Sequence, residues 1–243
     1  KIAYLKALGA TVYVCPANVA ADDPKSYYEV AKRIAQETPN SVYINQYFNE
    51  LNIDAHYQTT GPEIWEQTEG KITHLFACTG TGGTLSGSAK FLKEKNPNIK
   101  IIGVDADGSI LKGFHETGKI NKLDIHPYQI EGMGKNLIPS ALLFDKIDEF
   151  VRVNDEISAY RTRELALKEA IMGGYTTGAV TQGLLQYANS YEFKADDWVV
   201  LIFPDHGPRY ITKVYTDKGR EEKGFINNCF HNYDEVFKTE IIK

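Results

Sequence analysis

The sequence has few cysteines, and they form no pattern that indicates a metal site or a disulfide framework. Cys15, Cys78 and Cys229 are odd in number and widely spaced, and no C-x-x-C pair or paired histidine spacing accompanies them. Zinc sites and small disulfide-rich domains both depend on regular spacing of such residues. We therefore expect no metal site, no disulfide, and a location in the reducing cytoplasm.

Long apolar runs and an excess of basic residues are also lacking. No stretch approaches the roughly eighteen apolar residues that cross a bilayer, so we expect no membrane span. The formal net charge of −5 argues against nucleic acid and against an anionic membrane surface as partners. The 42% hydrophobic and 24% charged residues are ordinary values for a globular protein.

An initiator methionine and a signal-peptide pattern are missing as well. The chain opens at Lys1 with the end of a helix, a glycine stop at Gly9 and a β-type run over 11–15. It therefore begins in the middle of an α/β pattern, and we expect it to be a fragment of a longer protein.

The most informative stretch that is present covers residues 72–105. An apolar run over 72–78 predicts a strand, and the glycine-rich turn T-G-T-G-G ends it because glycine favours turns. A helix is predicted from Thr84 to the Asn-Pro-Asn stop at 96–98, and a second strand over 99–104, apolar on both faces. A strand, helix and strand of this length are typical of a parallel sheet covered by helices.

The turn between the first strand and the helix predicts a phosphate site. Glycines let backbone N–H groups approach an anion, and the start of the following helix adds unpaired amides and the positive end of its dipole. The hydroxyls of Thr79, Thr81 and Thr84 would add neutral donors. The loop lacks the lysine of a Walker motif, and it meets the dinucleotide fingerprint only in part, because Leu85 occupies the third glycine position. A tight turn without a ligand is the structural alternative.

The rest of the chain continues the alternation of helices and strands. Apolar periodicity predicts helices over 26–37, 55–59, 62–68, 155–172 and 179–188. Further strands are predicted over 42–47, 150–153 and 198–203, with a loop-rich segment over 106–128. The fold class is therefore α/β, a three-layer, open, mostly parallel sheet with helices on both faces.

Two further tight turns are predicted, at 131–135 and 173–178. Ligands of open α/β sheets gather at the carboxyl ends of the strands. We therefore expect these turns and the turn at 79–84 to meet at one cleft.

Five segments, in this order, resemble the pyridoxal-phosphate-dependent family of cystathionine β-synthase and cysteine synthase. They are GTGGT at 80–84, GVDADGSIL at 103–111, EGMG with IP at 131–139, GGYTTGA at 173–179 and FPDHGPRY at 203–210, and HYQTTGPEIW at 56–65 is similar too. The resemblance implies the tryptophan synthase β-like fold (fold type II), incomplete at the N-terminus. Residues 1–49 would be a remnant of the smaller N-terminal domain, 50–215 the larger cofactor-binding domain and 216–243 a C-terminal extension.

The resemblance also implies roles for individual residues. The phosphate of pyridoxal 5'-phosphate would be bound by the loop residues Gly80, Thr81, Gly82, Gly83 and Thr84. Thr176 matches the position whose hydroxyl faces the pyridine nitrogen, where the family usually has serine. Tyr57 and Gly132 match positions that line the substrate pocket. Cystathionine β-synthases often carry a tyrosine at the position of Lys135.

The lysine that forms the Schiff base in this family lies upstream of the position that matches Lys1. The resemblance therefore assigns no catalytic residue to this chain, and we expect the chain to be inactive alone. The full-length protein would be a pyridoxal-phosphate-dependent lyase and a homodimer.

The implied reaction is β-replacement on L-serine or an activated serine, with formation of cystathionine from homocysteine favoured. The segments GVDADGSI, EGMG and PDHG are more similar to cystathionine β-synthase than to cysteine synthase. Three alternatives stay open: a cysteine synthase that uses sulfide, an NAD-type dinucleotide-binding module built on the same turn, and a non-catalytic binding fragment.

Overall fold

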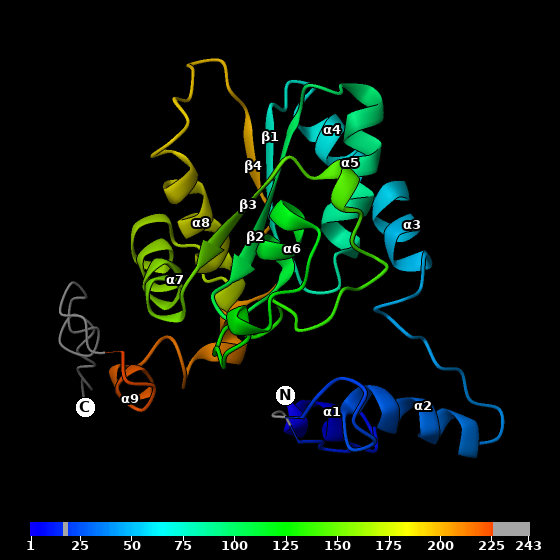
Figure 1. The fold of residues 1–243 in the computed structure, drawn as a ribbon. Helices are drawn as coiled ribbons and strands as arrows, with labels where there is room; N and C mark the ends of the chain where they lie inside the picture. Colours follow the sequence, from blue (N-terminus) through cyan, green and yellow to red (C-terminus); the bar gives the residue numbers. More distant parts are fainter. Residues whose placement is uncertain (17–18, 226–243) are drawn as a thin grey trace, which may run out of the picture.

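The centre of the molecule is a four-stranded, fully parallel sheet in the order β3-β2-β1-β4 (Figure 1). The computed structural model describes residues 1–16 and 19–225. Its strands are β1 (His74–Cys78), β2 (Lys100–Ala106), β3 (Glu149–Val153) and β4 (Val199–Leu201). Its helices are α1 (Ile2–Ala7), α2 (Tyr27–Glu37), α3 (Leu51–Gln58), α4 (Thr60–Gln67), α5 (Gly83–Lys95), α6 (Leu111–Thr117), α7 (Asp155–Glu169), α8 (Tyr175–Tyr187) and α9 (Asp217–Glu221). Single 3-10 turns lie at Lys122–Asp124, Phe144–Lys146 and Gly207–Tyr210.

Helices cover both faces of this sheet, so the predicted three-layer α/β fold is confirmed. α7 and α8 lie on one face, and α3, α4 and α5 lie on the other (Figure 1). Successive residues of a strand point to opposite faces: Phe76 belongs to the core under α7 and α8, whereas Leu75 and Ala77 belong to the core under α4 and α5. Both faces are therefore buried, which explains the continuous apolar runs of β1 and β2.

Local signals placed the starts of several helices correctly. Ser26 caps α2 by accepting a hydrogen bond from the Glu29 amide at 3.2 Å, and Asn154 caps α7 by accepting one from the Ile157 amide at 3.0 Å. The left-handed conformation of Ala170 ends α7 before the predicted limit at residue 172.

Four predictions of local structure are wrong. Residues 11–15 and 42–47 form no strand, although their composition is β-like, and Val14 and Val42 are 75% and 81% exposed. The segment 106–128 contains α6, which ends at Gly118 in the left-handed conformation. Residues 175–178, predicted as part of a turn, form the first turn of α8. Cys229 lies outside the described residues.

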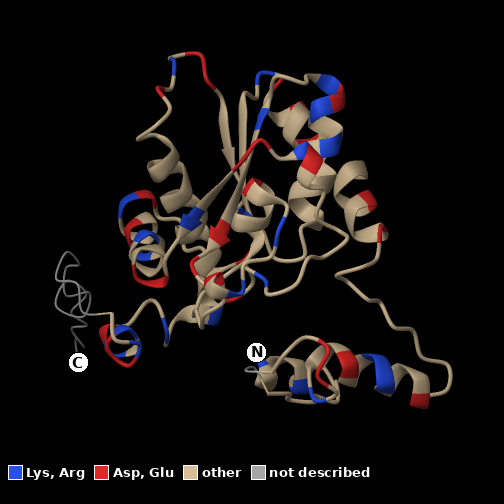
Figure 2. Cartoon of the chain, viewed as in Figure 1, with Lys and Arg blue, Asp and Glu red and all other residues tan. Residues whose placement is uncertain are grey.

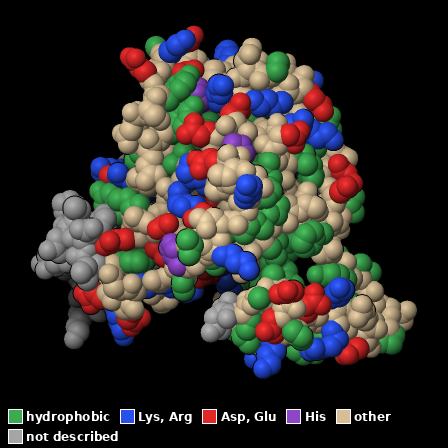
Figure 3. All heavy atoms as spheres, in the orientation of Figure 1, with side chains coloured by type: hydrophobic (Ala, Val, Ile, Leu, Met, Phe, Trp, Pro, Cys, Tyr) green, Lys and Arg blue, Asp and Glu red, His purple; other side chains and the backbone are tan. Residues whose placement is uncertain are grey.

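The N-terminal residues lie to one side of the sheet. Figure 1 shows α1 and α2 apart from the layers that contain the sheet, joined to them by the extended segment that precedes α3. In the N-terminal part that contains α1 and α2, exposed hydrophobic side chains lie among charged ones (Figure 3). The division into residues 1–49, 50–215 and 216–243 stays a prediction.

Charges of both signs alternate along the helices, as Figure 2 shows for α2, α5 and α7. Within residues 1–16 and 19–225, no helix combines the length and the apolar composition that a membrane span requires. The same residues include no group of three or more His, Cys, Asp or Glu side chains arranged to hold a metal ion.

Asp105, near the end of β2, makes the stability of the fold depend on pH. The carboxylate accepts hydrogen bonds from the amides of Ala106 and Lys112, both at 3.0 Å, and so ties α6 to the strand. Burial raises the pKa of Asp105 to about 6, although hydrogen bonds from Ser109 and from these amides lower it in part. The folded state therefore binds a proton more tightly than the unfolded state does.

We expect Asp105 by itself to lower the free energy of unfolding by about 3 kcal/mol as the pH rises from about 4 to above 6. Stability falls with rising pH because the folded state keeps the proton of Asp105 at pH values where the unfolded state has already lost it. This advantage disappears once the folded state loses the proton too, near pH 6. Urea unfolding of the wild type and of Asp105→Asn at several pH values measures the difference. Parallel pH profiles for the two proteins would contradict the assignment.

Candidate functional site

A cavity of about 530 Å³ lies at the carboxyl end of β1, and all three predicted turns reach it. Gly80, Thr81, Gly82 and Thr84 line it from the first turn, Glu131, Gly132 and Lys135 from the second, and Thr176 from the third. Pro204 and Asp205, beyond the end of β4, close another side. The predicted convergence of the turns on one cleft is confirmed.

The first two turns are in backbone contact, and this contact requires glycine. A Cβ atom on Gly80 would lie 2.5 Å from the carbonyl oxygen of Gly132. The amide of Gly134 also donates a hydrogen bond to the Thr79 carbonyl oxygen at 2.8 Å. Gly132 has a φ of +95°, a conformation that side chains disfavour. The two loops therefore form one rigid wall of the cavity.

The first turn carries amides with the properties of an anion site. Gly82 has a φ of +92° and precedes the first residue of α5, Gly83. Within the described residues, the backbone N–H groups of Gly80, Thr81, Gly82 and Thr84 have no hydrogen-bond acceptor. Amides left unpaired at the start of a helix bind anions, and the helix dipole favours negative charge there.

Two threonine hydroxyls of this loop are held by side chains of α3. Asn52 donates a hydrogen bond from Nδ2 to Thr81 Oγ1 at 3.0 Å, and His56 Nε2 lies 3.1 Å from Thr84 Oγ1. His56 Nδ1 bonds in turn to Thr60 Oγ1 at 2.8 Å. Burial lowers the pKa of His56, so the ring is neutral near pH 7 and one nitrogen donates while the other accepts.

Thr79 and Gly83 do not line the cavity. The Thr79 hydroxyl is buried and donates to the carbonyl oxygen of Val104 at 3.2 Å, so the expectation that it adds a donor to the loop is wrong. Gly83 allows close packing instead, because a Cβ atom there would lie 2.0 Å from Asn52 Oδ1.

Thr176 lies in the first turn of α8, next to the second loop. Cys78 Sγ donates to the Thr176 carbonyl oxygen at 3.4 Å, which joins this turn to the end of β1. Thr176 lines the cavity, whereas the next residue, Thr177, has the buried hydroxyl that finds no hydrogen-bond partner within the described residues. A neutral hydroxyl can hydrogen-bond a heteroaromatic nitrogen without keeping it protonated.

Tyr57, predicted to line the substrate pocket, lies elsewhere. Its hydroxyl donates to Glu94 Oε2 at 2.7 Å, its ring packs edge-on against Phe91, and Lys90 Nζ lies 4.8 Å from the ring centre. These contacts place Tyr57 between α3 and α5, away from the cavity. A substrate role for Tyr57 has no support from this placement.

Tyr47 lines the cavity and was not foreseen, because it lies at the end of the segment predicted as a strand. Burial raises the pKa of its hydroxyl, but the Lys135 ammonium group and hydrogen bonds outweigh burial and lower it overall. Tyr47 OH lies 3.2 Å from Lys135 Nζ and 3.0 Å from Tyr27 OH. The polar pair Asn45-Gln46, within an otherwise β-like run, was the signal of a turn here.

The donor set fits pyridoxal 5'-phosphate. The unpaired amides of the first turn and the hydroxyls of Thr81 and Thr84 match the needs of a phosphate ester, and the Thr176 hydroxyl matches a pyridine nitrogen. Gly80, Gly82 and Gly132 border the space, so this part of its wall is made of backbone.

The comparisons with known proteins agree with this fit. The model of the family "Pyridoxal-phosphate dependent enzyme" matches residues 1–205. The chain belongs to this family, whose members depend on pyridoxal phosphate.

Several of the proteins similar to this chain are named cystathionine β-synthases. The chain is 37% identical to the cystathionine β-synthase of Apis mellifera over 96% of its own length and 45% of that protein, and 38% identical to that of Rattus norvegicus over 93% and 39%. The crystal structure of the O-acetylserine-dependent cystathionine β-synthase of Helicobacter pylori is similar with a TM-score of 0.75 and 33% identity, covering 87% of this chain and 65% of that one. The chain thus spans less than half of the insect and rat proteins.

Proposed function

We propose that the intact protein catalyses pyridoxal-phosphate-dependent β-replacement on L-serine or an activated serine. Homocysteine is the favoured thiol and cystathionine the product. The observation that carries this proposal is a single cavity lined both by the unpaired amides of Gly80, Thr81 and Gly82 and by Thr176. The names of the relatives, cystathionine β-synthase and its O-acetylserine-dependent form, support the same reaction.

The residues of this chain would have separate roles in binding the cofactor and the substrate. The amides of Gly80, Thr81, Gly82 and Thr84 would bind the phosphate, and the bond between Thr84 and His56 orients the Thr84 hydroxyl. Thr176 would offer its neutral hydroxyl to the ring nitrogen, which such a group does not keep protonated. The bound cofactor supplies an electron sink for the substrate carbon. Gly132 borders the substrate and leaves room for it.

We propose that the Schiff-base lysine belongs to a part of the intact protein outside these 243 residues. The protein would act as a cytoplasmic homodimer. The NAD-type interpretation is not retained, because the family match assigns another cofactor and Leu85, at the third glycine position, is buried in the core.

The reaction is tested with the purified intact protein. We expect a yellow protein that converts serine or O-acetylserine together with homocysteine into cystathionine, measured by product chromatography. Parallel rates with sulfide separate this activity from that of a cysteine synthase. A protein that stays colourless after addition of pyridoxal phosphate contradicts the proposal.

Replacing Thr84 with alanine should weaken cofactor binding by about 1 to 3 kcal/mol, the range for one hydrogen bond to a charged group. Titration of the apo form of the intact protein with pyridoxal phosphate measures the affinity by visible absorbance. Thr117→Ala is the matched control, because the Thr117 hydroxyl bonds only within and just beyond α6. Unchanged affinity in Thr84→Ala would remove Thr84 from the phosphate site.

A further inference from the structure

Lys135 is a cation at the candidate site whose charge is not neutralised by a neighbouring carboxylate. Within residues 1–16 and 19–225, its Nζ atom forms no ion pair, and Tyr47 OH is its hydrogen-bond acceptor at 3.2 Å. The same nitrogen lies 4.7 Å from the centre of the Tyr47 ring. An ammonium group has three donors, so others stay available to a ligand.

The other charged groups that line this cavity have partners. Glu131 pairs with Lys1 and with Lys213. Asp205 accepts a hydrogen bond from Tyr210 OH at 2.8 Å and lies 3.8 Å from Arg209 NH1. A negatively charged ligand is therefore drawn to Lys135 rather than to the paired cations.

The backbone holds Lys135 firmly in this position. Its amide donates to Ser109 Oγ at 2.9 Å, and its carbonyl oxygen accepts from the Ile110 amide at 2.9 Å. Gly134 before it has a φ of +72° and packs against Tyr128, to whose OH a Cβ atom would lie only 2.7 Å away. Tyr47, which positions the ammonium group, is held by a hydrogen bond from the Ala141 amide to its carbonyl oxygen at 3.3 Å.

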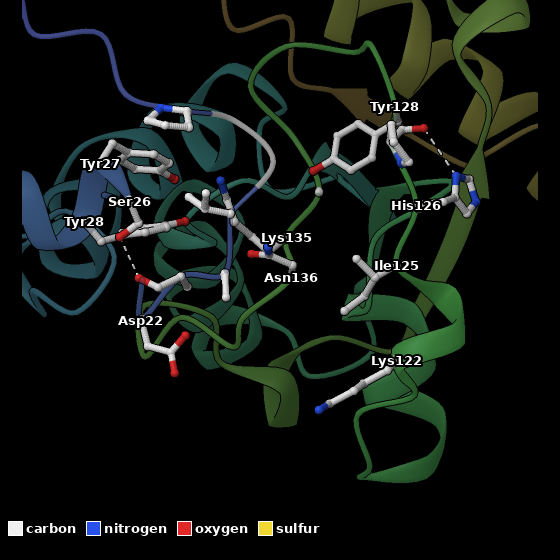
Figure 4. Close-up of a pocket in the computed structure, with 17 residues that line it drawn as sticks. Asp22, Ser26, Tyr27, Tyr28, Lys122, Ile125, His126, Tyr128, Lys135 and Asn136 are labelled. Atoms are coloured by element: carbon white, nitrogen blue, oxygen red, sulfur yellow. Dashed lines mark hydrogen bonds between the residues drawn. The ribbon is translucent and has the colours of Figure 1, made fainter. Parts of the chain in front are cut away.

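Lys135 also borders a second, larger cavity of about 880 Å³, so it lies where the two cavities meet. Figure 4 shows Lys135 between Tyr27 and Tyr28 on one side and Tyr128 on the other. The start of α2 lines this cavity through Tyr27 and Tyr28, and the segment around His126 lines it as well. A molecule that extends from this cavity toward the three turns meets Lys135, because Lys135 lines both cavities.

We propose that Lys135 binds the carboxylate of the second substrate and so selects an amino-acid thiol over sulfide. The inference rests on the proposed function and adds the residue that chooses the acceptor. A thiol such as homocysteine carries a carboxylate that can bond to the free donors of the ammonium group, and sulfide carries none. The tyrosines beside Lys135 supply apolar surface for the carbon chain of such a substrate.

The experiment compares Lys135→Met, which removes the charge, with Lys135→Arg, which keeps it, in the intact protein loaded with pyridoxal phosphate. Initial rates are measured with L-homocysteine, with 3-aminopropane-1-thiol, which lacks the carboxylate, and with sulfide. We expect Lys135→Met to lower kcat/KM for homocysteine about 10- to 100-fold, mainly through KM, as for one lost charged hydrogen bond. Rates with the other two nucleophiles should change less than about twofold, and Lys135→Arg should restore most of the loss.

The controls separate this inference from the proposed function. Lys119→Met, at an exposed lysine outside both cavities, should behave as the wild type. The spectral change of the bound cofactor upon addition of serine or O-acetylserine without thiol reports the first half of the reaction. If the wild type shows no such change, the proposed function fails.

If that change is normal, the proposed function stands, and three results would overturn only the role of Lys135. They are an equal loss for all three nucleophiles in Lys135→Met, no loss for homocysteine, and a wild type that accepts sulfide but not homocysteine. A weakened response of Lys135→Met to serine alone would also overturn it, because the lysine would then bind the first substrate.

Discussion

Replacing Gly80 with alanine is expected to abolish cofactor binding by the intact protein. The new Cβ atom would lie 2.5 Å from the Gly132 carbonyl oxygen, a backbone atom that cannot rotate away. The two loops are also joined by the hydrogen bond from the Gly134 amide to the Thr79 carbonyl oxygen. To relieve the clash, the first turn must move as a whole, and its amides then lose the arrangement that binds a phosphate.

The expected loss of affinity is at least about 100-fold, because several hydrogen bonds to a charged group are disturbed together. Titration with pyridoxal phosphate measures it, and thermal unfolding of the apo form shows whether the fold is retained. Gly113→Ala is the control, since a Cβ atom there meets only the end of the Asp124 side chain at 2.7 Å. Normal loading of Gly80→Ala would show that the turn does not hold the cofactor.

Replacing Gly178 with alanine should cause a large loss of stability. Gly178 lies in α8 where this helix touches α7, and a Cβ atom would lie 2.0 Å from the Ser158 carbonyl oxygen and 2.2 Å from Thr162 Oγ1. The Thr162 hydroxyl already donates to the same carbonyl oxygen at 2.9 Å, so neither atom can give way. The helices must separate, and overpacking of this kind costs about 3 kcal/mol.

Urea unfolding of the apo form measures this cost, with Gly113→Ala on α6 again as the control. Cofactor binding is a second measurement, because Thr176 lies in the same turn of α8 as Gly178. A displaced helix therefore also moves the Thr176 hydroxyl away from the cavity. We therefore expect weaker cofactor binding in Gly178→Ala at temperatures where the protein stays folded. Wild-type stability would mean that the two helices tolerate a wider separation.

Much of the sheet and its principal turn could be predicted because the signals are local. The strands at 72–78 and 99–104 are continuous apolar runs, and the glycines of the turn at 79–84 stand directly between a strand and a helix. The same composition was misleading at 11–15 and 42–47, where no neighbouring strand among the described residues offers hydrogen bonds. A strand exists only when it has a partner, and the partner is remote in sequence.

The sequence by itself determined the α/β architecture, the glycine turns and the chemistry expected of them, since each depends on backbone freedom and apolar periodicity over a few residues. Only the tertiary structure decided which side chains share the cavity. It placed Tyr47 and Lys135 there, moved Tyr57 away to Glu94 and turned the Thr79 hydroxyl into the core. These contacts join residues 25 to 88 positions apart and arise from how helices pack on the sheet, and no local pattern encodes that packing.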